Sequence, residues 1–456
     1  MKYISTRGKI EPVSFSEAII MGLARDGGLL LPDRIPDVAQ KFDEWRNLSY
    51  IDLAYEIMRI FVDIPDEDLR TIVEKSYSTF NYEDVTPVVD MVNVYILELF
   101  HGPTLAFKDV ALQFLGNLFE YILAQWDGEL NILTATSGDT GSAAIHGVRG
   151  KERIRIFVMH PKGKTSKTQE LQMTSVLDEN VFNMAVAGTF DNCQSIMKSI
   201  FSDLEFKDRY SLGTANSINW GRVLAQVVYY FYASFQVQER TDAQRVRFAV
   251  PTGNFGDIFA GYIASKMGLP VGKLVLATNE NNILARFFNN GDYSLSQVVE
   301  TLSPSMDIQV ASNFERYLYY RVNKNSSVLC DLMEQFSKTG SLALHENKDD
   351  LFETGSANRQ ETLDVIRNCM EKNNYLLDPH TAVGYHVAQK HLNADEPMIC
   401  LATAHPAKFS EAIIEATGND LAHHPALDAL KGLSTRCQDM PDSSAAVKEY
   451  IAGRLA

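Results

Sequence analysis

The chain has 456 residues, 45% hydrophobic and 22% charged, and this length is enough for about two or three domains with substantial buried cores. Its 42 basic and 58 acidic residues give a formal net charge of −16, which disfavours nonspecific binding to nucleic acid or to an anionic membrane. No apolar run reaches membrane-spanning length, and the N-terminus has no signal-peptide core. The five cysteines are scattered and never form a Cys-x-x-Cys pair, which predicts a cytoplasmic protein without a disulfide framework or a metal site.

Residues 1–92 are predicted to form a mainly helical N-terminal segment. Ser14 stands three residues before Glu17, ahead of an apolar run, which is the pattern of a capping box. Helical spacing recurs around Leu53 and Leu69. We interpret this segment as a packing unit without chemistry of its own.

From residue 93 onward, apolar strands alternate with amphipathic helices. The predicted strands cover residues 93–100, 130–136, 154–160, 181–187, 247–251, 274–278 and 398–403. This alternation predicts an α/β fold in which mostly parallel sheets are covered by helices. Ligands in such folds bind at the carboxyl ends of the strands, in the loops that lead into helices. We interpret residues 290–360, which are polar and rich in Asn and Ser, as an excursion without assigned chemistry.

The stretch from His101 to Asp109 follows the first of these strands. Gly102 and Pro103 end the strand and apolar residues then recur at helical spacing, so Lys108 is predicted to lie near the start of a helix. The free N–H groups there disfavour the ammonium form of a lysine, and the neutral amine is the form that makes a Schiff base. A single lysine is more often a solvated surface residue, so the other loops must decide.

Three strand-to-helix loops are rich in small or hydroxyl-bearing residues. The loop from Thr136 to Gly141 can close on an anion at a helix N-terminus, or it can be a simple N-capped turn. The loop from Pro251 to Asp257 has two glycines that suit a phosphate cradle, but no Gly-Lys-Ser/Thr follows, which excludes an NTPase P-loop. The third stretch, residues 403–409, is by itself only a polar strand end.

A polar segment from Thr214 to Arg222 adds amide groups and an arginine. Asn216 and Ser217 can cap the next helix and Arg222 can pair on the surface, but an arginine is also the expected fork for a substrate phosphate. A lysine that forms an imine, a glycine loop for a phosphate and a hydroxyl-rich loop for a carboxylate are together the parts of a pyridoxal-phosphate site.

Five of these motifs resemble, in the same order, the longer branch of the threonine synthase family, whose members are fold-type-II pyridoxal-phosphate enzymes. The motifs are residues 101–109, 137–141, 216–222, 253–257 and 403–409. The resemblance also covers residues 1–32, so it runs nearly end to end, whereas the tail after about residue 425 carries little signal. It implies a fold similar to that of the tryptophan synthase β chain, with pyridoxal 5′-phosphate as the cofactor.

The resemblance also implies a role for each motif. Lys108 would form the Schiff base with the cofactor and then shuttle protons, while Thr403 would hydrogen-bond the pyridine nitrogen. The cofactor phosphate would be held by backbone amides of Gly253, Asn254, Phe255, Gly256 and Asp257. The residues implied for substrate binding are Ser137, Gly138, Asp139, Thr140, Asn216, Ser217, Asn219 and Arg222.

Asp139 departs from the wider pattern, because many relatives with this fold have Asn at the corresponding position. An ionised carboxylate beside a substrate carboxylate would be repulsive. Asp139 is therefore expected to point elsewhere or to be neutralised.

The resemblance implies conversion of O-phospho-L-homoserine and water to L-threonine and phosphate, the last step of threonine biosynthesis, by a monomer or a homodimer. The alternative is a serine/threonine dehydratase or a β-replacement enzyme of the same fold, and a non-catalytic relative that binds only the cofactor is a third possibility. The expected domains are the N-terminal segment 1–92, a smaller α/β domain 93–240 with the cofactor lysine, and a larger α/β domain 241–456 with the phosphate loop and the C-terminal tail. Part of the N-terminal segment is expected to pack with the larger domain.

Overall fold

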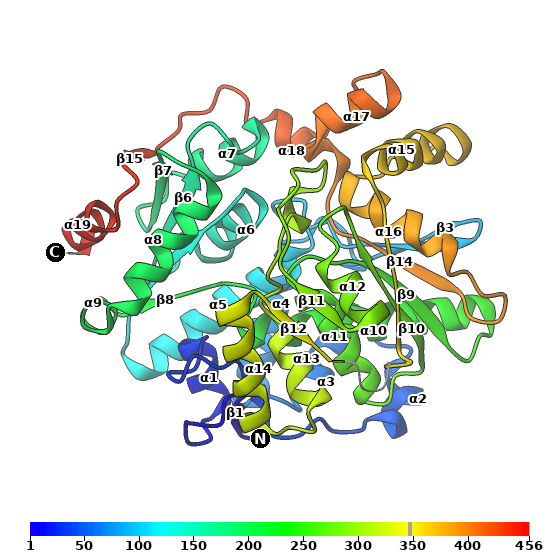
Figure 1. Ribbon diagram of the computed structural model, residues 1–456, viewed down its shortest axis with the longest axis horizontal. Helices are drawn as coiled ribbons and strands as arrows, with labels where there is room; N and C mark the ends of the chain where they lie inside the picture. The colour runs from blue at the N-terminus through cyan, green and yellow to red at the C-terminus, as the bar shows by residue number, and fades with distance from the viewer. Residues whose placement is uncertain (345–348, 456) are drawn as a thin grey trace.

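Two sheets of mostly parallel strands organise the molecule (Figure 1). The computed structural model describes residues 1–344 and 349–455. In the six-stranded sheet, β3 pairs antiparallel with β4 and the other neighbours pair parallel. Its strand order is β13 (Phe352–Ser356), β10 (Val271–Thr278), β9 (Val246–Pro251), β14 (Met398–Ala402), β4 (Val94–Glu98) and β3 (Val88–Met91).

The five-stranded sheet is parallel throughout, and its strands β6 and β7 lie at the upper left of Figure 1. Its strand order is β15 (Gln438–Met440), β7 (Val181–Val186), β6 (Ile154–Pro161), β5 (Leu130–Ala135) and β8 (Leu212–Gly213). The helices in and beside this part are α6 (Asp139–Val148), α7 (Lys167–Thr174), α8 (Phe190–Ser202), α9 (Leu204–Arg209) and the C-terminal α19 (Ser444–Leu455). The α/β alternation and all seven predicted strands are thus confirmed, with small differences at the strand ends.

Two long helices form the centre of the main core, because their apolar residues face other elements on nearly every side. They are α5 (Lys108–Trp126) and α10 (Trp220–Thr241). Helix α10 packs against α5, α3 (Tyr50–Met58) and α11 (Gly256–Lys266), and most of its residues are buried. The other helices with the six-stranded sheet are α11 (Gly256–Lys266), α12 (Ile283–Asn290), α15 (Arg359–Asn373), α16 (Pro379–Lys390) and α17 (Ser410–Thr417).

The N-terminal segment packs onto α5 and α10 and shares their core. Its elements are β1 (Tyr3–Ser5), α1 (Phe15–Met21), β2 (Leu30–Pro32), α2 (Phe42–Trp45), α3 (Tyr50–Met58) and α4 (Asp66–Tyr77). The predicted capping box is present, since Ser14 accepts from the N–H of Glu17 and Glu17 accepts from the N–H of Ser14. The buried aromatic rings of Tyr3, Phe61 and Trp220 meet where this segment joins α10.

The polar stretch 290–360 is folded in its described part, and residues 345–348 of it lie outside the described residues. Strands β11 (Asp292–Ser294) and β12 (Ser341–Ala343) pair antiparallel, and the stretch also contains the short turn η2 (Pro304–Met306), α13 (Phe314–Arg321) and α14 (Ser326–Thr339). Some of its polar residues bond to one another: Thr301 donates to the Asp307 carboxylate, and the hydroxyls of Ser294 and Ser341 share a hydrogen bond. The stretch also buries the rings of Tyr293, Phe314, Tyr317 and Phe336 in the main core, so apolar packing stabilises it together with these hydrogen bonds.

At two places, a strand belongs to a different sheet from the strands that are next to it in the sequence. Strands β3 and β4 belong to the sheet that β9, β10 and β14 complete, and the C-terminal β15 joins the sheet of β5 to β8. The division into domains at residues 93 and 241 remains a prediction. Within the described ranges, no helix is both long and apolar enough to cross a membrane.

Candidate functional site

The carboxyl ends of strands from both sheets converge on one pocket with about 730 Å³ of empty space, its open mouth included. The loops after β4, β5, β9 and β14 all contribute to its wall, as expected for a ligand site in an α/β fold. The lining residues are Phe107, Lys108, Asp139, Thr140, Ser217, Arg222, Gln226, residues 251–257, Ser305, Met306, His380, Thr403 and Ala404.

Lys108 is the first residue of α5 and is only 7% exposed, so it is not a solvated surface lysine. Its Nζ lies 3.3 Å from Oδ2 of Asp139. Burial lowers the pKa of the Lys108 amine, and although Asp139 opposes this, the charges of Lys408 and Arg222 add to the lowering. The amine is thereby biased toward the neutral form that reacts as a nucleophile.

Asp139 begins α6 and is buried between two lysines. Its Oδ1 lies 2.9 Å from Nζ of Lys408 and accepts a 2.8 Å hydrogen bond from Gln169, while its Oδ2 faces Lys108. Burial works to raise the pKa of Asp139, but Lys408 and Lys108 outweigh it and hold the pKa well below its usual range. The carboxylate is thus ionised, and its charge is balanced by cations of the protein itself. This is one of the two arrangements expected from the sequence.

Thr403 is held by its backbone at the end of β14. Its N–H donates to Oγ1 of Thr381, and its carbonyl oxygen accepts from the N–H of Phe107 at 2.8 Å. Thr381 in turn donates to the buried carboxylate of Asp378, the N-cap residue of α16. The Thr403 side chain lines the pocket with both backbone groups already bonded, so its hydroxyl is positioned for a ligand.

The loop after β9 turns sharply into α11. Phe255 has a left-handed backbone (φ +63°), which its buried ring secures by packing against Phe288, Phe314, Tyr317 and Phe352. A Cβ on Gly253 would lie 2.5 Å from the carbonyl oxygen of Ser305, so only glycine fits there. The first N–H groups of a helix have no intrahelical partner, and those of α11 open at this pocket.

Asp257 points away from these N–H groups toward two tyrosines of α10. The hydroxyls of Tyr229 and Tyr230 donate to its Oδ1 at 2.5 and 3.0 Å. Burial raises the pKa of the Asp257 carboxyl to about 6, against the lowering by both tyrosines. Its contribution to a bound phosphate would come through the backbone.

Arg222 carries a buried positive charge on the pocket wall. The side chain is 4% exposed, and its one hydrogen bond among the described residues runs from Nη1 to the carbonyl oxygen of Ala215. Its Nε is buried without a partner, and no carboxylate pairs with it in the described part of the chain. Burial lowers the pKa of its guanidinium to about 10. A buried cation of this kind indicates a binding site for an anion.

Four of the predicted substrate-binding residues do not line this pocket. Ser137 is half-buried, and the Gly138 N–H donates to Oγ1 of Thr136. Asn216 accepts from Thr134, and Asn219 caps α10 by accepting from the N–H of Gly221. Their contact with a substrate remains a prediction.

Several residues of the site lie outside the motifs or had no role in them, among them Lys408, His380, Gln169 and Ser305. Lys408 stands within the 403–409 stretch, but its partner Asp139 is remote in sequence. His380 follows Asp378, which caps α16, and Pro379. These two residues predict the start of a helix, but they do not predict that the helix lies beside the pocket. No local sequence pattern around Gln169 or Ser305 indicates that either residue belongs to the site.

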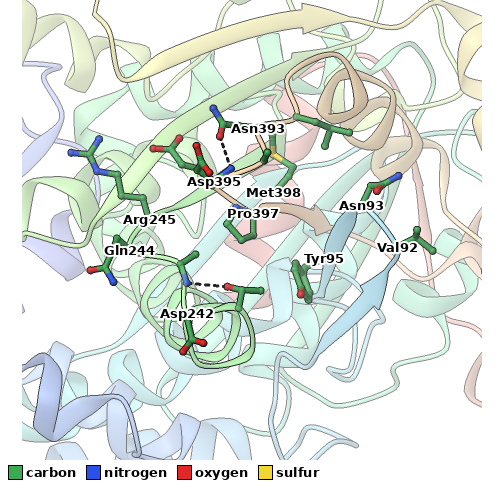
Figure 2. A pocket seen from close by; sticks show the side chains of 15 residues that line it. Val92, Asn93, Tyr95, Asp242, Gln244, Arg245, Asn393, Asp395, Pro397 and Met398 are labelled. Atoms are coloured by element: carbon green, nitrogen blue, oxygen red, sulfur yellow. Dashed lines mark hydrogen bonds between the residues drawn. The ribbon is translucent and has the colours of Figure 1, made fainter.

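A second pocket lies at the opposite edge of the six-stranded sheet (Figure 2). Tyr95, Arg245 and Met398 line it near the amino ends of β4, β9 and β14, together with Asn393 and Asp395. Its lining contains no lysine, so the pocket at the carboxyl ends of the strands, which contains Lys108, remains the candidate functional site.

Three family models match consecutive parts of the chain. The threonine synthase N terminus matches residues 2–77, the pyridoxal-phosphate dependent enzyme family matches residues 81–347, and the threonine synthase C-terminal family matches residues 381–451. The chain is 47% identical to a threonine synthase of Saccharomyces cerevisiae, covering 91% of this chain and 88% of that protein. It is 45% identical to a threonine synthase of Methylobacillus glycogenes, with complete coverage of both chains.

The same relationship holds in three dimensions. The crystal structure of a PLP-bound threonine synthase from Brucella melitensis superposes with a TM-score of 0.96 at 42% identity, covering 100% of this chain and 99% of that one. The sequence motifs, the fold and the arrangement of the pocket therefore agree, and this chain belongs to the threonine synthase family.

Proposed function

We propose that this protein is a threonine synthase that converts O-phospho-L-homoserine and water to L-threonine and phosphate with pyridoxal 5′-phosphate as its cofactor. One observation carries the proposal: a single pocket holds the buried Lys108 and two separate anion-binding features. These are the N-terminus of α11 and the guanidinium of Arg222, which no carboxylate pairs with among the described residues. One suits the phosphate of the cofactor and the other suits the phosphate of the substrate.

The residues of the pocket fit this cofactor. The backbone from Gly253 to Asp257 would hold its phosphate, Lys108 would bind its aldehyde carbon, and Thr403 would donate to its ring nitrogen. When bound, the cofactor supplies an electron sink that acidifies the C–H bonds of an attached amino acid. A neutral hydroxyl at the ring nitrogen suits an unprotonated ring, whereas a carboxylate would favour the protonated one.

The reaction requires protons to leave Cα and Cβ of the substrate before its γ-phosphate leaves, and a proton to return before water adds at Cβ. The Lys108 amine, which burial biases toward its neutral form, is the base that would take up and return these protons. Arg222 would hold the phosphate throughout, so that the group is oriented before the C–O bond breaks and stabilised as it departs.

The substrate carboxylate would bind at the start of α6. Thr140 lines the pocket there, and the first N–H groups of α6 lie beside it. We also propose substrate contacts for Ser137, Gly138, Asn216, Ser217 and Asn219. Asp139 would be kept from repelling the carboxylate by Lys408, whose Nζ lies 2.9 Å from its Oδ1.

A serine/threonine dehydratase or a β-replacement enzyme is the alternative. Such a reaction needs the cofactor phosphate site but no second buried cation. Arg222, which has no carboxylate partner in the described part of the chain, therefore favours a phosphorylated substrate. A non-catalytic relative would not need a lysine whose pKa is lowered by burial.

We further propose a cytoplasmic location, since all five cysteines are free thiols, and either a monomer or a homodimer. The acidic net charge supports a small-molecule substrate without nucleic-acid or membrane partners.

The test is to incubate purified protein with O-phospho-L-homoserine and to measure threonine and phosphate in parallel. Equal amounts of the two products support the proposal, and Lys108→Ala should form neither. If the protein instead forms a ketoacid from serine or threonine, and forms no threonine from O-phospho-L-homoserine, it is a dehydratase.

A further inference from the structure

Lys408 is a buried lysine to which no step of the proposed reaction has been assigned. It lies in the short turn η3 (Pro406–Lys408) after β14 and is 2% exposed. Its Nζ donates a 2.7 Å hydrogen bond to the carbonyl oxygen of Thr104 and lies 2.9 Å from Oδ1 of Asp139. The ammonium group is therefore fixed between the loop that precedes Lys108 and the start of α6.

The two carboxylate oxygens of Asp139 have different partners. Its Oδ1 is held by Lys408 and by Gln169, whereas its Oδ2 faces Lys108 at 3.3 Å. If Lys408 were absent, the only cation in contact with this buried carboxylate, among the described residues, would be Lys108. A buried carboxylate strongly favours the charged form of a neighbouring lysine, because an uncompensated charge in the interior is costly.

The charged and titratable groups around Lys108 come from several elements. They are Asp139 on α6, Arg222 on α10, Asp257 on α11, His380 on α16 and Lys408 on η3. Asp257 accepts from two tyrosine hydroxyls, and the His380 ring accepts from the Ser305 N–H at Nε2 and donates from Nδ1 to Asp378, so neither group neutralises Asp139 by direct contact. Lys408 is thus the group whose charge directly offsets that of Asp139 without taking part in the pocket wall.

We propose that Lys408 is a positioning residue whose ammonium group balances the Asp139 carboxylate, so that Lys108 is available as the uncharged amine. The inference rests on the proposed role of Lys108 as the cofactor lysine. It also gives the carboxylate at position 139 a partner, so that Asp139 and Lys408 act together as one neutral unit.

The test follows the reaction of Lys108 with the cofactor in the absence of substrate. Full-length protein stripped of cofactor is mixed with pyridoxal phosphate at pH values from about 6 to 10, reduced with borohydride, and digested to quantify the adduct on Lys108. The pH midpoint of the initial rate reports when Lys108 becomes neutral. Lys408→Met should raise this midpoint by about one pH unit or more, because Asp139 then stabilises the Lys108 ammonium alone.

The paired variants separate charge balance from a purely structural role. Asp139→Asn with Lys408→Met removes both charges and should return the midpoint close to that of the wild type, and Lys408→Arg should keep it there. Lys431→Met removes an exposed lysine that pairs with Asp428 at 2.6 Å, and should leave the midpoint unchanged. A loss of packing alone would lower thermal stability in Lys408→Met without moving the midpoint.

An unchanged midpoint in folded Lys408→Met, or the same upward shift in the double variant, would overturn the inference. If Lys408→Met does not fold, Asp139→Asn is compared with the double variant. Asp139→Asn should then have the lower midpoint, because Lys408 repels Lys108 without compensation, and equal midpoints would contradict the inference. A protein that shows these shifts but makes no threonine would refute the proposed function alone.

Discussion

The backbone N–H of Phe107 donates a 2.8 Å hydrogen bond to the carbonyl oxygen of Thr403. The N–H of His405 donates back to the carbonyl oxygen of Leu105 at 3.0 Å, and Ala106 and Ala404 form an antiparallel bridge between these bonds. The loop that carries Lys108 and the loop that carries Thr403 are thus joined as one short ladder. The backbone positions of Lys108 and Thr403 are therefore fixed relative to each other by hydrogen bonds between the two loops.

Replacing Thr403 by Val removes the hydroxyl but keeps the side-chain shape and the backbone ladder. We expect the fold to be retained and the cofactor affinity to fall about ten- to hundredfold, since an unpaired ring nitrogen in a buried site costs roughly 1–3 kcal/mol. Titration of the cofactor-free variant with pyridoxal phosphate measures this loss. An unchanged affinity would mean that another group faces the ring nitrogen.

Replacing Arg222 by Met should separate substrate binding from stability. The KM for O-phospho-L-homoserine should rise strongly, because losing a charge-assisted contact in a closed site costs about 2–5 kcal/mol, whereas cofactor affinity should not change. The thermal midpoint should stay the same or rise, since Arg222 is a desolvated cation with one hydrogen bond and a buried, unpartnered Nε. A destabilised variant with wild-type KM would make Arg222 a structural residue.

Replacing Gly253 by Ala tests the close approach of the phosphate loop to η2. The new Cβ would lie 2.5 Å from the carbonyl oxygen of Ser305, so the backbone must move and both stability and cofactor affinity should fall, by about 1–3 kcal/mol in stability. The matched control is Gly453→Ala in α19, where no atom of the described residues, apart from the neighbouring residues and the helix's own backbone, lies within 4 Å of the added methyl group. Helix propensity predicts that this control is stabilised by up to about 1 kcal/mol. Equal effects of the two substitutions would contradict the prediction.

Asp257 predicts a pH dependence of stability. Burial raises the pKa of its carboxyl in the folded protein to about 6, above the ordinary value of 3.8, so its contribution is present below about pH 4 and is lost as pH rises through 6. At pH 7 the ionised buried carboxylate costs roughly 3 kcal/mol relative to its protonated form. Asp257→Asn has no proton to lose, and its amide oxygen can still accept from both tyrosines.

The difference in the free energy of unfolding between Asp257→Asn and wild type, measured with urea, should therefore change with pH in one direction. The variant should gain stability relative to wild type as pH rises from 4 to 7, by up to about 3 kcal/mol. Parallel stability curves over this range would show that the Asp257 carboxyl ionises in the folded state as it does in the unfolded chain.

The sequence predicts well those elements that depend only on local patterns, such as the spacing of apolar residues, helix caps and glycine or proline breaks. Strand β4 followed by the glycine and proline of residues 102–103 and by an apolar helix places Lys108 at the first residue of α5. The start of α11 after Gly253 and the capping box at Ser14 follow from equally local signals. The resemblance then assigned roles to these positions, and those roles remain predictions for the individual residues.

The features that the sequence does not predict are contacts between segments far apart in the chain. Alternation of strands and helices says nothing about which sheet β4 joins, and that is decided by its pairing with β14 and β3. The pair of Lys408 with Asp139 joins η3 to α6, and neither short segment has a periodicity that indicates its partner. Ser305 reaches the site from a polar stretch that is held by buried aromatic residues such as Phe314 and by hydrogen bonds such as that of Thr301 to Asp307, and these contacts have no periodic signal in the sequence.

The most direct measurement of the central claim is turnover of O-phospho-L-homoserine in water enriched in oxygen-18. Because the proposed reaction breaks the C–O bond to the phosphate and then adds water at Cβ, the label should enter the threonine hydroxyl and not the released phosphate. The two products should also form in equal amounts. Label in the phosphate together with homoserine would show simple hydrolysis of the P–O bond, and would contradict the account.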